Sequence, residues 1–196
     1  MKTHVLTRVV AALTLVSGGL AAHAAAASSN RDDAALEVVR QLTKQYHDVA
    51  VAEADGFVQT DPCIPAMGLH YVNAERWDER LEPGRPEVIL YAPTLDGGRQ
   101  LVGAEWVVTD DDQNLATDHD RPQLFGHDFL GPMPGHAPGQ PIHYDLHAYA
   151  WVDNPLGGFA PFNPGVQCVG VVGDGTSVAS HHVHEAPTAE SFGGDG

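Results

Sequence analysis

Proline and glycine interrupt this chain so often after residue 56 that no long helix fits there. They form four breakers, at 83–86, 97–98, 131–135 and 138–141, and such residues end helices and strands. Between them lie runs rich in β-branched and aromatic residues, which predict five strands, namely Met67–Val72, Glu87–Tyr91, Gln100–Thr109, Gln123–Leu130 and Ile142–Val152. The gaps between these runs have hairpin length, so we expect a mostly antiparallel sheet.

One amphipathic helix precedes the strands. Apolar residues recur at three- and four-residue steps from Leu36 to Ala50, with Ser and Asn before them and Gly56 after them. Because Ser and Asn cap helix N-termini and Gly ends helices, this pattern predicts a helix from about residue 31 to 54. We therefore expect an α+β fold with the N-terminal helix packed on the sheet. The alternative is a small β-barrel closed by the helix.

The N-terminal segment is typical of a secretory signal. Lys2 and Arg8 precede an apolar run from Val9 to Leu20, and small residues follow it. The run is shorter than the roughly 20 apolar residues that span a bilayer, although an N-terminal anchor or a buried helix would have a similar composition. We predict a signal peptide at 1–27, a single domain at 28–172 and a disordered, His-containing tail at 173–196, hence a secreted or extracytoplasmic protein.

Charge narrows the range of partners. The predicted signal peptide contains two of the 10 basic residues and none of the 26 acidic ones, so the mature chain would carry a net charge of −18. Such a surface repels nucleic-acid phosphates and anionic lipid headgroups. We expect no nucleic-acid partner and no membrane association of the mature form, whereas cations are favoured.

The only two cysteines are Cys63 and Cys168. A single pair in an exported chain indicates a disulfide. The alternatives are two buried free thiols or two metal ligands, but the pair lacks the Cys-x-x-Cys spacing of many zinc sites.

Missing residue types exclude several kinds of catalyst. No serine lies between Ser29 and Ser177, so a serine nucleophile is unavailable in the domain. Lys44 is the only lysine after the signal peptide and lies within the predicted helix, which disfavours Schiff-base chemistry. No phosphate-binding or dinucleotide fingerprint is present. The remaining reactive side chains are His, Asp, Glu and Tyr, which suit metal ligation and acid–base chemistry.

Four residues on predicted strands are candidate metal ligands: His70, Glu105, His143 and His147. Alternation places His143, Asp145 and His147 on one face of their strand. His143 and His147 would stand about 13 Å apart, too far to share one ion. We therefore predict that His70, Glu105 and His147 bind a transition metal ion (Zn, Cu or Fe), with His143 as a fourth ligand and Asp145 behind the ligands. Alternatively, each residue lies on a solvated face or is a core histidine bonded to a carbonyl.

Two other segments have a metal-binding composition. Asp110, Asp112 and Asn114 alternate as in an EF-hand, but Leu115 and Arg121 replace the required Gly and Glu. We interpret this segment as a solvated acidic loop, with a weak calcium site as the alternative. The tail contains His181, His182 and His184, which would bind copper or zinc weakly.

Three segments of the domain resemble a group of uncharacterised secreted bacterial proteins: Cys63–Asn73, Pro86–Tyr91 and His143–Trp151 with the following Asp153–Pro155. The resemblance covers about residues 35–168. It implies one secreted domain that ends near Cys168, and it implies no activity.

The sequence therefore favours a secreted metal-binding protein, with a metalloenzyme as one form of that function. The alternative is a secreted module that binds a small molecule or glycan without metal. Its stacking surface would consist of aromatic side chains, namely Trp77, Trp106, Tyr149 and Trp151.

Overall fold

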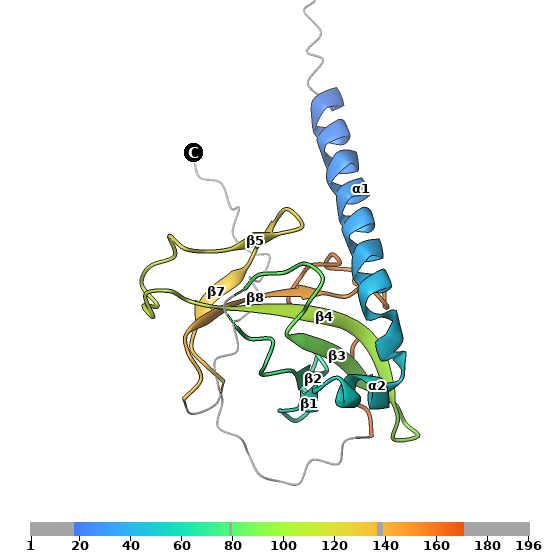
Figure 1. The fold of residues 1–196 in the computed structure, drawn as a ribbon. Helices are drawn as coiled ribbons and strands as arrows, with labels where there is room; N and C mark the ends of the chain where they lie inside the picture. Colours follow the sequence, from blue (N-terminus) through green and yellow to red (C-terminus); the bar gives the residue numbers. More distant parts are fainter. Residues whose placement is uncertain (1–17, 79, 137–138, 171–196) are drawn as a thin grey trace, which may run out of the picture.

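The structure, a computed structural model, describes residues 18–78, 80–136 and 139–170. In these residues three helical segments precede eight strands (Figure 1). The helical segments are α1 (Gly18–Thr43), the 3-10 helix η1 (Lys44–His47) and α2 (Val49–Ala54). The strands are β1 (Val58–Gln59), β2 (Leu69–Val72), β3 (Val88–Pro93), β4 (Arg99–Thr109), β5 (Gln123–Leu124), β6 (His127–Asp128), β7 (Leu130–Met133) and β8 (His143–Ala148).

Six strands form one sheet in the order β1-β2-β3-β4-β8-β7, and every pairing in it is antiparallel. β5 and β6 form a separate two-stranded hairpin. Figure 1 shows α1 lying across the sheet, with its first turns extending beyond the sheet edge. The prediction of an α+β fold with a mostly antiparallel sheet is confirmed, and the sheet is not closed into a barrel.

The helical region differs in detail from the prediction of one helix over 31–54. The helix α1 already runs from Gly18, and the chain leaves the α-helical path at Lys44. Asp48 has an extended backbone, and its side chain accepts a hydrogen bond from the Ala50 amide. Because this cap starts a new helix, the predicted helix is divided into three pieces. Gly56, with φ of +88°, follows α2 and ends the helical region as expected.

The prediction of one continuous strand over Gln123–Leu130 is wrong, because this segment contains the two short strands β5 and β6 and the start of β7. Each of the other four predicted strands overlaps one observed strand. Phe125 and Gly126 both have positive φ, 56° and 86°, as the central residues of a tight hairpin turn do. This turn separates β5 from β6, and β7 begins at Leu130. The predicted strand over 142–152 is also shorter, because β8 ends at Ala148. The two-residue strand β1 was not predicted.

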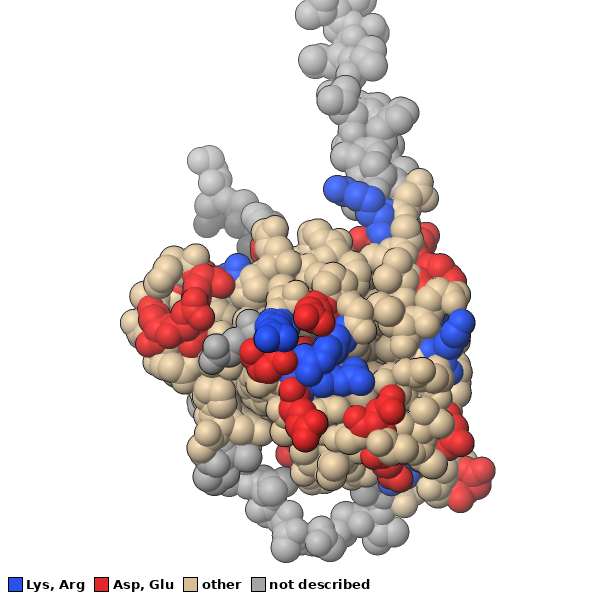
Figure 2. Space-filling model, in the orientation of Figure 1, with Lys and Arg blue, Asp and Glu red and all other residues tan. Residues whose placement is uncertain are grey.

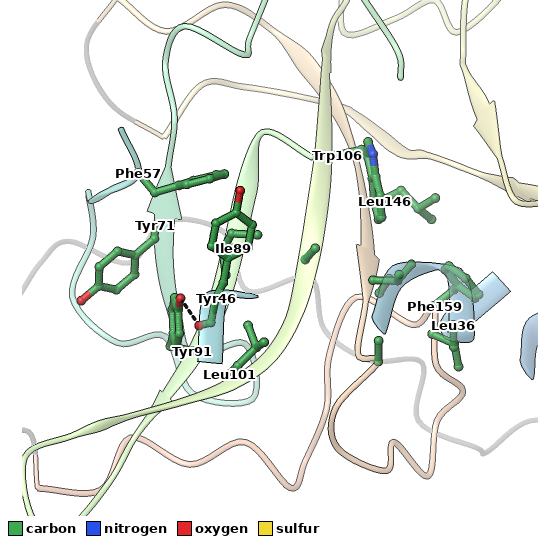
Figure 3. Packing of buried hydrophobic residues seen from close by; sticks show 14 of the residues in the cluster. Leu36, Tyr46, Phe57, Tyr71, Ile89, Tyr91, Leu101, Trp106, Leu146 and Phe159 are labelled. Carbon is green, nitrogen blue, oxygen red and sulfur yellow. Dashed lines mark hydrogen bonds between the residues drawn. The ribbon is translucent and has the colours of Figure 1, made fainter. Parts of the chain in front are cut away.

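The main core lies between the sheet and the helices. Leu36 and Val39 of α1 are buried in the same cluster as Trp106 and Leu146 of the sheet. Figure 3 shows part of this cluster. Towards the other end of this cluster, the Tyr91 hydroxyl donates a 2.6 Å hydrogen bond to the Tyr46 carbonyl. Each fully buried large side chain of this kind stabilises the fold by about 1.5–3 kcal/mol, so this layer holds the helices on the sheet.

The opposite face of the sheet is covered by loops. Its apolar residues form a second cluster, with Val88, Leu90, Val102, Val107, Tyr149 and Val166 at its centre. Cys63 and Cys168 are joined by a disulfide, as predicted, and this bond ties together two of the covering loops. Beside it, the Ala66 amide donates to the Val166 carbonyl at 3.1 Å. With both faces buried, β4 and β8 contain few exposed residues.

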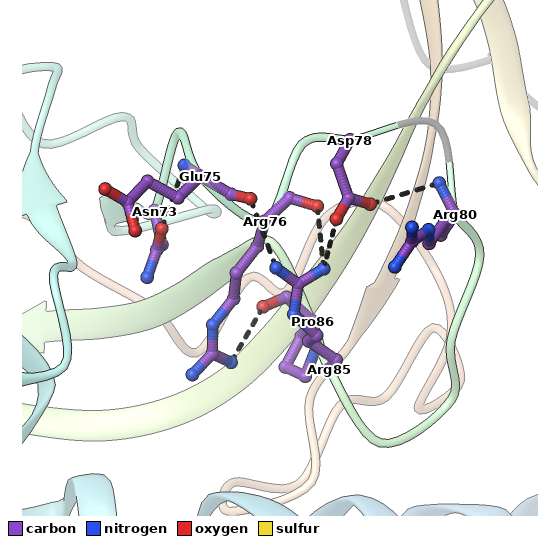
Figure 4. A network of polar contacts seen from close by, with 7 residues as sticks. All are labelled: Asn73, Glu75, Arg76, Asp78, Arg80, Arg85 and Pro86. Atoms are coloured by element: carbon purple, nitrogen blue, oxygen red, sulfur yellow. Dashed lines mark hydrogen bonds and ion pairs between the residues drawn. The ribbon is translucent and has the colours of Figure 1, made fainter.

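A polar network stabilises the loop between β2 and β3 (Figure 4). The Arg85 guanidinium binds Asp78 at 2.8 Å and donates to the carbonyls of Glu75 and Arg76. This loop carries Trp77, whose indole nitrogen donates to Thr109 on β4 at 3.0 Å. The loop is therefore held against the face of the sheet that carries the second cluster. Figure 2 shows basic side chains beside acidic ones on the visible surface, which is consistent with such pairs.

The predicted domain limits remain predictions. Residues 1–17 and 171–196 lie outside the described residues, so the whole predicted tail and most of the predicted signal peptide do as well. No helix in the described part of the chain is long and apolar enough to cross a membrane.

Candidate metal centre

Strand register brings the candidate ligands together on the loop-covered face. Glu105 of β4 lies directly opposite His147 of β8, so their side chains emerge on the same face as a cross-strand pair. On the other side of β4, Glu105 is opposite Val88 of β3. His70 of β2 is opposite Leu90, two residues further along β3, and it therefore shares this face and approaches the pair diagonally.

The three side chains are arranged around a common point. His70 Nε2 lies 3.6 Å from Glu105 Oε2, and His147 Nε2 lies 3.9 Å from the same oxygen. One ligand atom from each of the three residues lies within 4.8 Å of the other two. Tetrahedral ligands at about 2.0–2.1 Å from an ion stand roughly 3.4 Å apart. A contraction of a few tenths of an ångström up to about 1.4 Å would therefore enclose one ion.

These ligand atoms are buried and largely unpaired. The side chains of His70, Glu105 and His147 are 10%, 6% and 1% exposed. Among the described residues, six buried side-chain nitrogen or oxygen atoms lack a hydrogen-bond partner, and all but the one on Asp110 belong to this centre: His70 Nδ1, Glu105 Oε2, Asp145 Oδ1, His147 Nδ1 and His147 Nε2. Each buried polar atom without a partner costs about 1–3 kcal/mol. A bound cation would use several of these lone pairs.

Burial also shifts the pKa values in the centre. Burial, reinforced by the nearby His147, lowers the pKa of His70 to about 3. Burial raises the pKa of Glu105 to about 8. For His147, burial acts to lower the pKa, but the carboxylates of Glu105 and Asp145 outweigh it and raise the pKa to about 9. In the metal-free protein near neutral pH, Glu105 and His147 therefore keep protons that a cation would have to displace, while His70 offers a neutral imidazole.

His143 does not join this group. It pairs with Thr109, which lies four residues beyond Glu105 on β4. Its Nδ1 lies 3.2 Å from the Pro141 carbonyl oxygen. Its ring packs edge-on against Trp77 and His136. Of the four predicted ligands, the structure thus brings three together and leaves His143 in a neighbouring position, because four strand residues span about 13 Å.

Asp145 lies behind His147, where the sequence analysis had placed a supporting residue. Asp145 Oδ1 is 3.5 Å from His147 Nδ1. The Asp145 side chain is 4% exposed. The two carboxylates therefore approach different nitrogens of the same imidazole, Glu105 at Nε2 and Asp145 at Nδ1.

The aromatic residues of the metal-free alternative do not form one surface. Trp106 is buried on the helix side of the sheet, and Tyr149 is buried in the second cluster on the opposite side. The Trp151 indole nitrogen donates to Thr43 of α1. These side chains stabilise the fold from different layers.

Two cavities open elsewhere. The larger, about 670 Å³, lies between α1 and residues 149–158 and is lined by none of the three candidate ligands. The smaller, about 150 Å³, is lined partly by Asp145 and His147. Its apolar lining residues Phe129, Leu146 and Phe159 belong to the helix-side core, so this cavity reaches the centre only at Asp145 and His147.

Several side-chain oxygen atoms of the acidic loop accept hydrogen bonds from within the loop. Asp110 and Asp112 both accept hydrogen bonds from the Asn114 amide, and Asp112 also accepts from the Thr117 hydroxyl. Within the described residues, the group of three potential ligands that meets the distance criterion for one ion is that of His70, Glu105 and His147. This supports the interpretation of the loop as a self-bonded surface turn.

Comparison of the chain with protein-family models, with curated proteins and with solved structures found no match. The resemblance to secreted bacterial proteins stays a prediction.

Proposed function

We propose that this protein binds one transition metal ion, zinc, copper or iron, through His70, Glu105 and His147. The observation that carries the proposal is the convergence of two imidazoles and one carboxylate, in which Glu105 Oε2 and His147 Nε2 are buried without a hydrogen-bond partner. Native proteins leave few buried polar atoms unpaired. Glu105 Oε2 and His147 Nε2 face each other at 3.9 Å without any hydrogen-bond partner. A cation bound between them explains this pair better than tolerance of the cost of two unpaired atoms does.

Three protein ligands leave at least one coordination position for water or another small molecule. This is the arrangement of catalytic zinc sites and of non-haem iron sites, so a metalloenzyme is one form of the proposed function. Because the three side chains are at most 10% exposed, a polymer such as a peptide or glycan cannot reach them in this conformation. A substrate of this centre would be small.

The Cys63–Cys168 disulfide supports a location outside the cytoplasm, because such bonds persist in oxidising compartments. The N-terminal sequence supports the same location. Extracytoplasmic metal binding is therefore the function that we propose for the domain.

The test is metal titration of the mature chain in which the tail histidines are replaced (His181→Ala, His182→Ala and His184→Ala). This background removes the competing His-rich tract without truncating the protein. We expect one equivalent of Zn²⁺ or Co²⁺ to bind, with an affinity that falls as pH is lowered, because protons compete for the ligands.

His147→Ala is expected to weaken binding by at least about 100-fold, more than the loss of a supporting residue would. His119→Ala serves as the matched control, since His119 is an exposed residue of the acidic loop. Absence of metal binding, or full retention by His147→Ala, would refute the proposed site and favour the metal-free binding module.

A further inference from the structure

The geometry around His147 points to a function for Asp145, and this inference rests on the proposed metal site. Asp145 and His147 are two residues apart on β8, so their side chains emerge on the same face. Asp145 Oδ1 lies 3.5 Å from His147 Nδ1, and both atoms are buried without a hydrogen-bond partner. A shift of a few tenths of an ångström would bring them within normal hydrogen-bond distance.

We propose that Asp145 is a positioning residue that accepts the Nδ1 proton of His147 and so directs the Nε2 lone pair at the metal ion. A neutral imidazole carries its proton on one nitrogen, and the partner of that nitrogen decides which one remains free as a ligand. Glu105 faces Nε2 at 3.9 Å. The ion would therefore bind between Glu105 and Nε2, while Asp145 holds the ring from the other side.

The contact between Asp145 and His147 also distinguishes the two histidines of the centre. His70 Nδ1 is buried and has no hydrogen-bond partner in the described structure, whereas a carboxylate stands behind Nδ1 of His147. A carboxylate that accepts the second N–H of a ligating histidine increases its basicity and fixes its orientation. His147 is thus the imidazole whose orientation is set in advance.

The experiment compares Asp145→Ala and Asp145→Asn with the parent protein, in the mature chain that lacks the tail histidines. Zn²⁺ and Co²⁺ are the probes. We expect Asp145→Ala to weaken binding about 10–100-fold, the usual cost of losing such a support, with one equivalent of metal still bound. Asp145→Asn should fall between the two, because its amide oxygen still accepts the proton but carries no charge.

Nitrogen-15 NMR of the zinc-loaded protein gives a readout that a general loss of stability would not produce. The parent should show a protonated Nδ1 and a metal-bound Nε2 at His147. In Asp145→Ala the Nδ1 proton should exchange faster with water. Asp110→Ala is the matched control, since Asp110 is another buried aspartate with an unpartnered oxygen. This control should leave metal affinity and the His147 signals unchanged.

Three results would overturn the inference. Metal affinity of Asp145→Ala within threefold of the parent would show that Asp145 does not support His147. Loss of one ligand from the Co²⁺ coordination sphere, measured by X-ray absorption, would make Asp145 a ligand itself. If the parent protein binds no metal, the proposed metal site itself is refuted. The other two results refute only the function of Asp145, because they require a parent protein that binds metal. Asp145→Asn keeps the test decisive if Asp145→Ala does not fold.

Discussion

The disulfide offers the clearest quantitative test of how this fold is held together. Cys63 and Cys168 are separated by 105 residues, and a cross-link restricts the unfolded chain by an entropy that grows with the loop it closes. For a loop of this length the chain-entropy model gives about 4.8 kcal/mol at 25 °C, and measured losses for native disulfides are about 2–5 kcal/mol. We therefore expect the double variant Cys63→Ala/Cys168→Ala to lose about 3–5 kcal/mol of unfolding free energy.

The folded state should survive this change, because other contacts join the same two loops. The Ala66 amide donates to the Val166 carbonyl, the Asn163 amide donates to the Ala66 carbonyl at 2.7 Å, and the Tyr149 hydroxyl also donates to that carbonyl. At about 2.1 cal/mol/K per residue, a domain of roughly 140 residues should then unfold about 10–17 °C lower.

Urea unfolding followed by tryptophan fluorescence and circular dichroism would measure the loss. Wild-type protein that has been reduced and alkylated is the control, and it should resemble the double variant. A loss below about 1 kcal/mol would refute the entropic argument. Loss of secondary structure without urea would show instead that the loops depend on the bond to remain on the sheet.

Three further changes test other layers of the structure. Burial raises the pKa of Glu87 to about 7, against an ordinary value of 4.5, so metal-free protein should lose about 2–3 kcal/mol of stability between pH 4.5 and 7 as the unfolded chain releases the proton first. Glu87→Gln should remove this part of the pH dependence in urea titrations, and an unchanged slope would contradict the assignment. Trp106→Ala removes a fully buried side chain and should cost about 3–5 kcal/mol by urea unfolding; a cost below about 1 kcal/mol would contradict the described core. Gly103→Ala would place a Cβ against the Ala148 carbonyl and should lower the melting temperature, whereas an unchanged value would show that β4 and β8 separate easily.

Local chemistry in the sequence was enough to predict the fold class. The breakers after residue 56 limited the chain to short strands, and apolar periodicity from Leu36 onwards marked the helix that packs on them. Both signals depend on a residue and its near neighbours. The same local reasoning did not predict that Asp48 caps a new helix. It also did not predict the turn at Phe125, because a phenylalanine rarely adopts the positive φ observed there.

The candidate centre could be predicted only in part from the sequence. Alternation along one strand showed that Asp145 and His147 share a face, and the distance along that strand separated His143 from His147. The convergence of Glu105 with His147 depends on the register between β4 and β8, and a slip of one residue would send Glu105 to the opposite face.

His70 reaches the centre from two strands away, through pairings that no local pattern encodes. Burial was likewise decided by the whole fold, because loops tied by the disulfide cover the face that carries the ligands. The sequence by itself determined which side chains were available to bind a metal ion. Only the tertiary structure decided which of them meet, since strand register and loop packing arise from contacts between residues far apart in the chain.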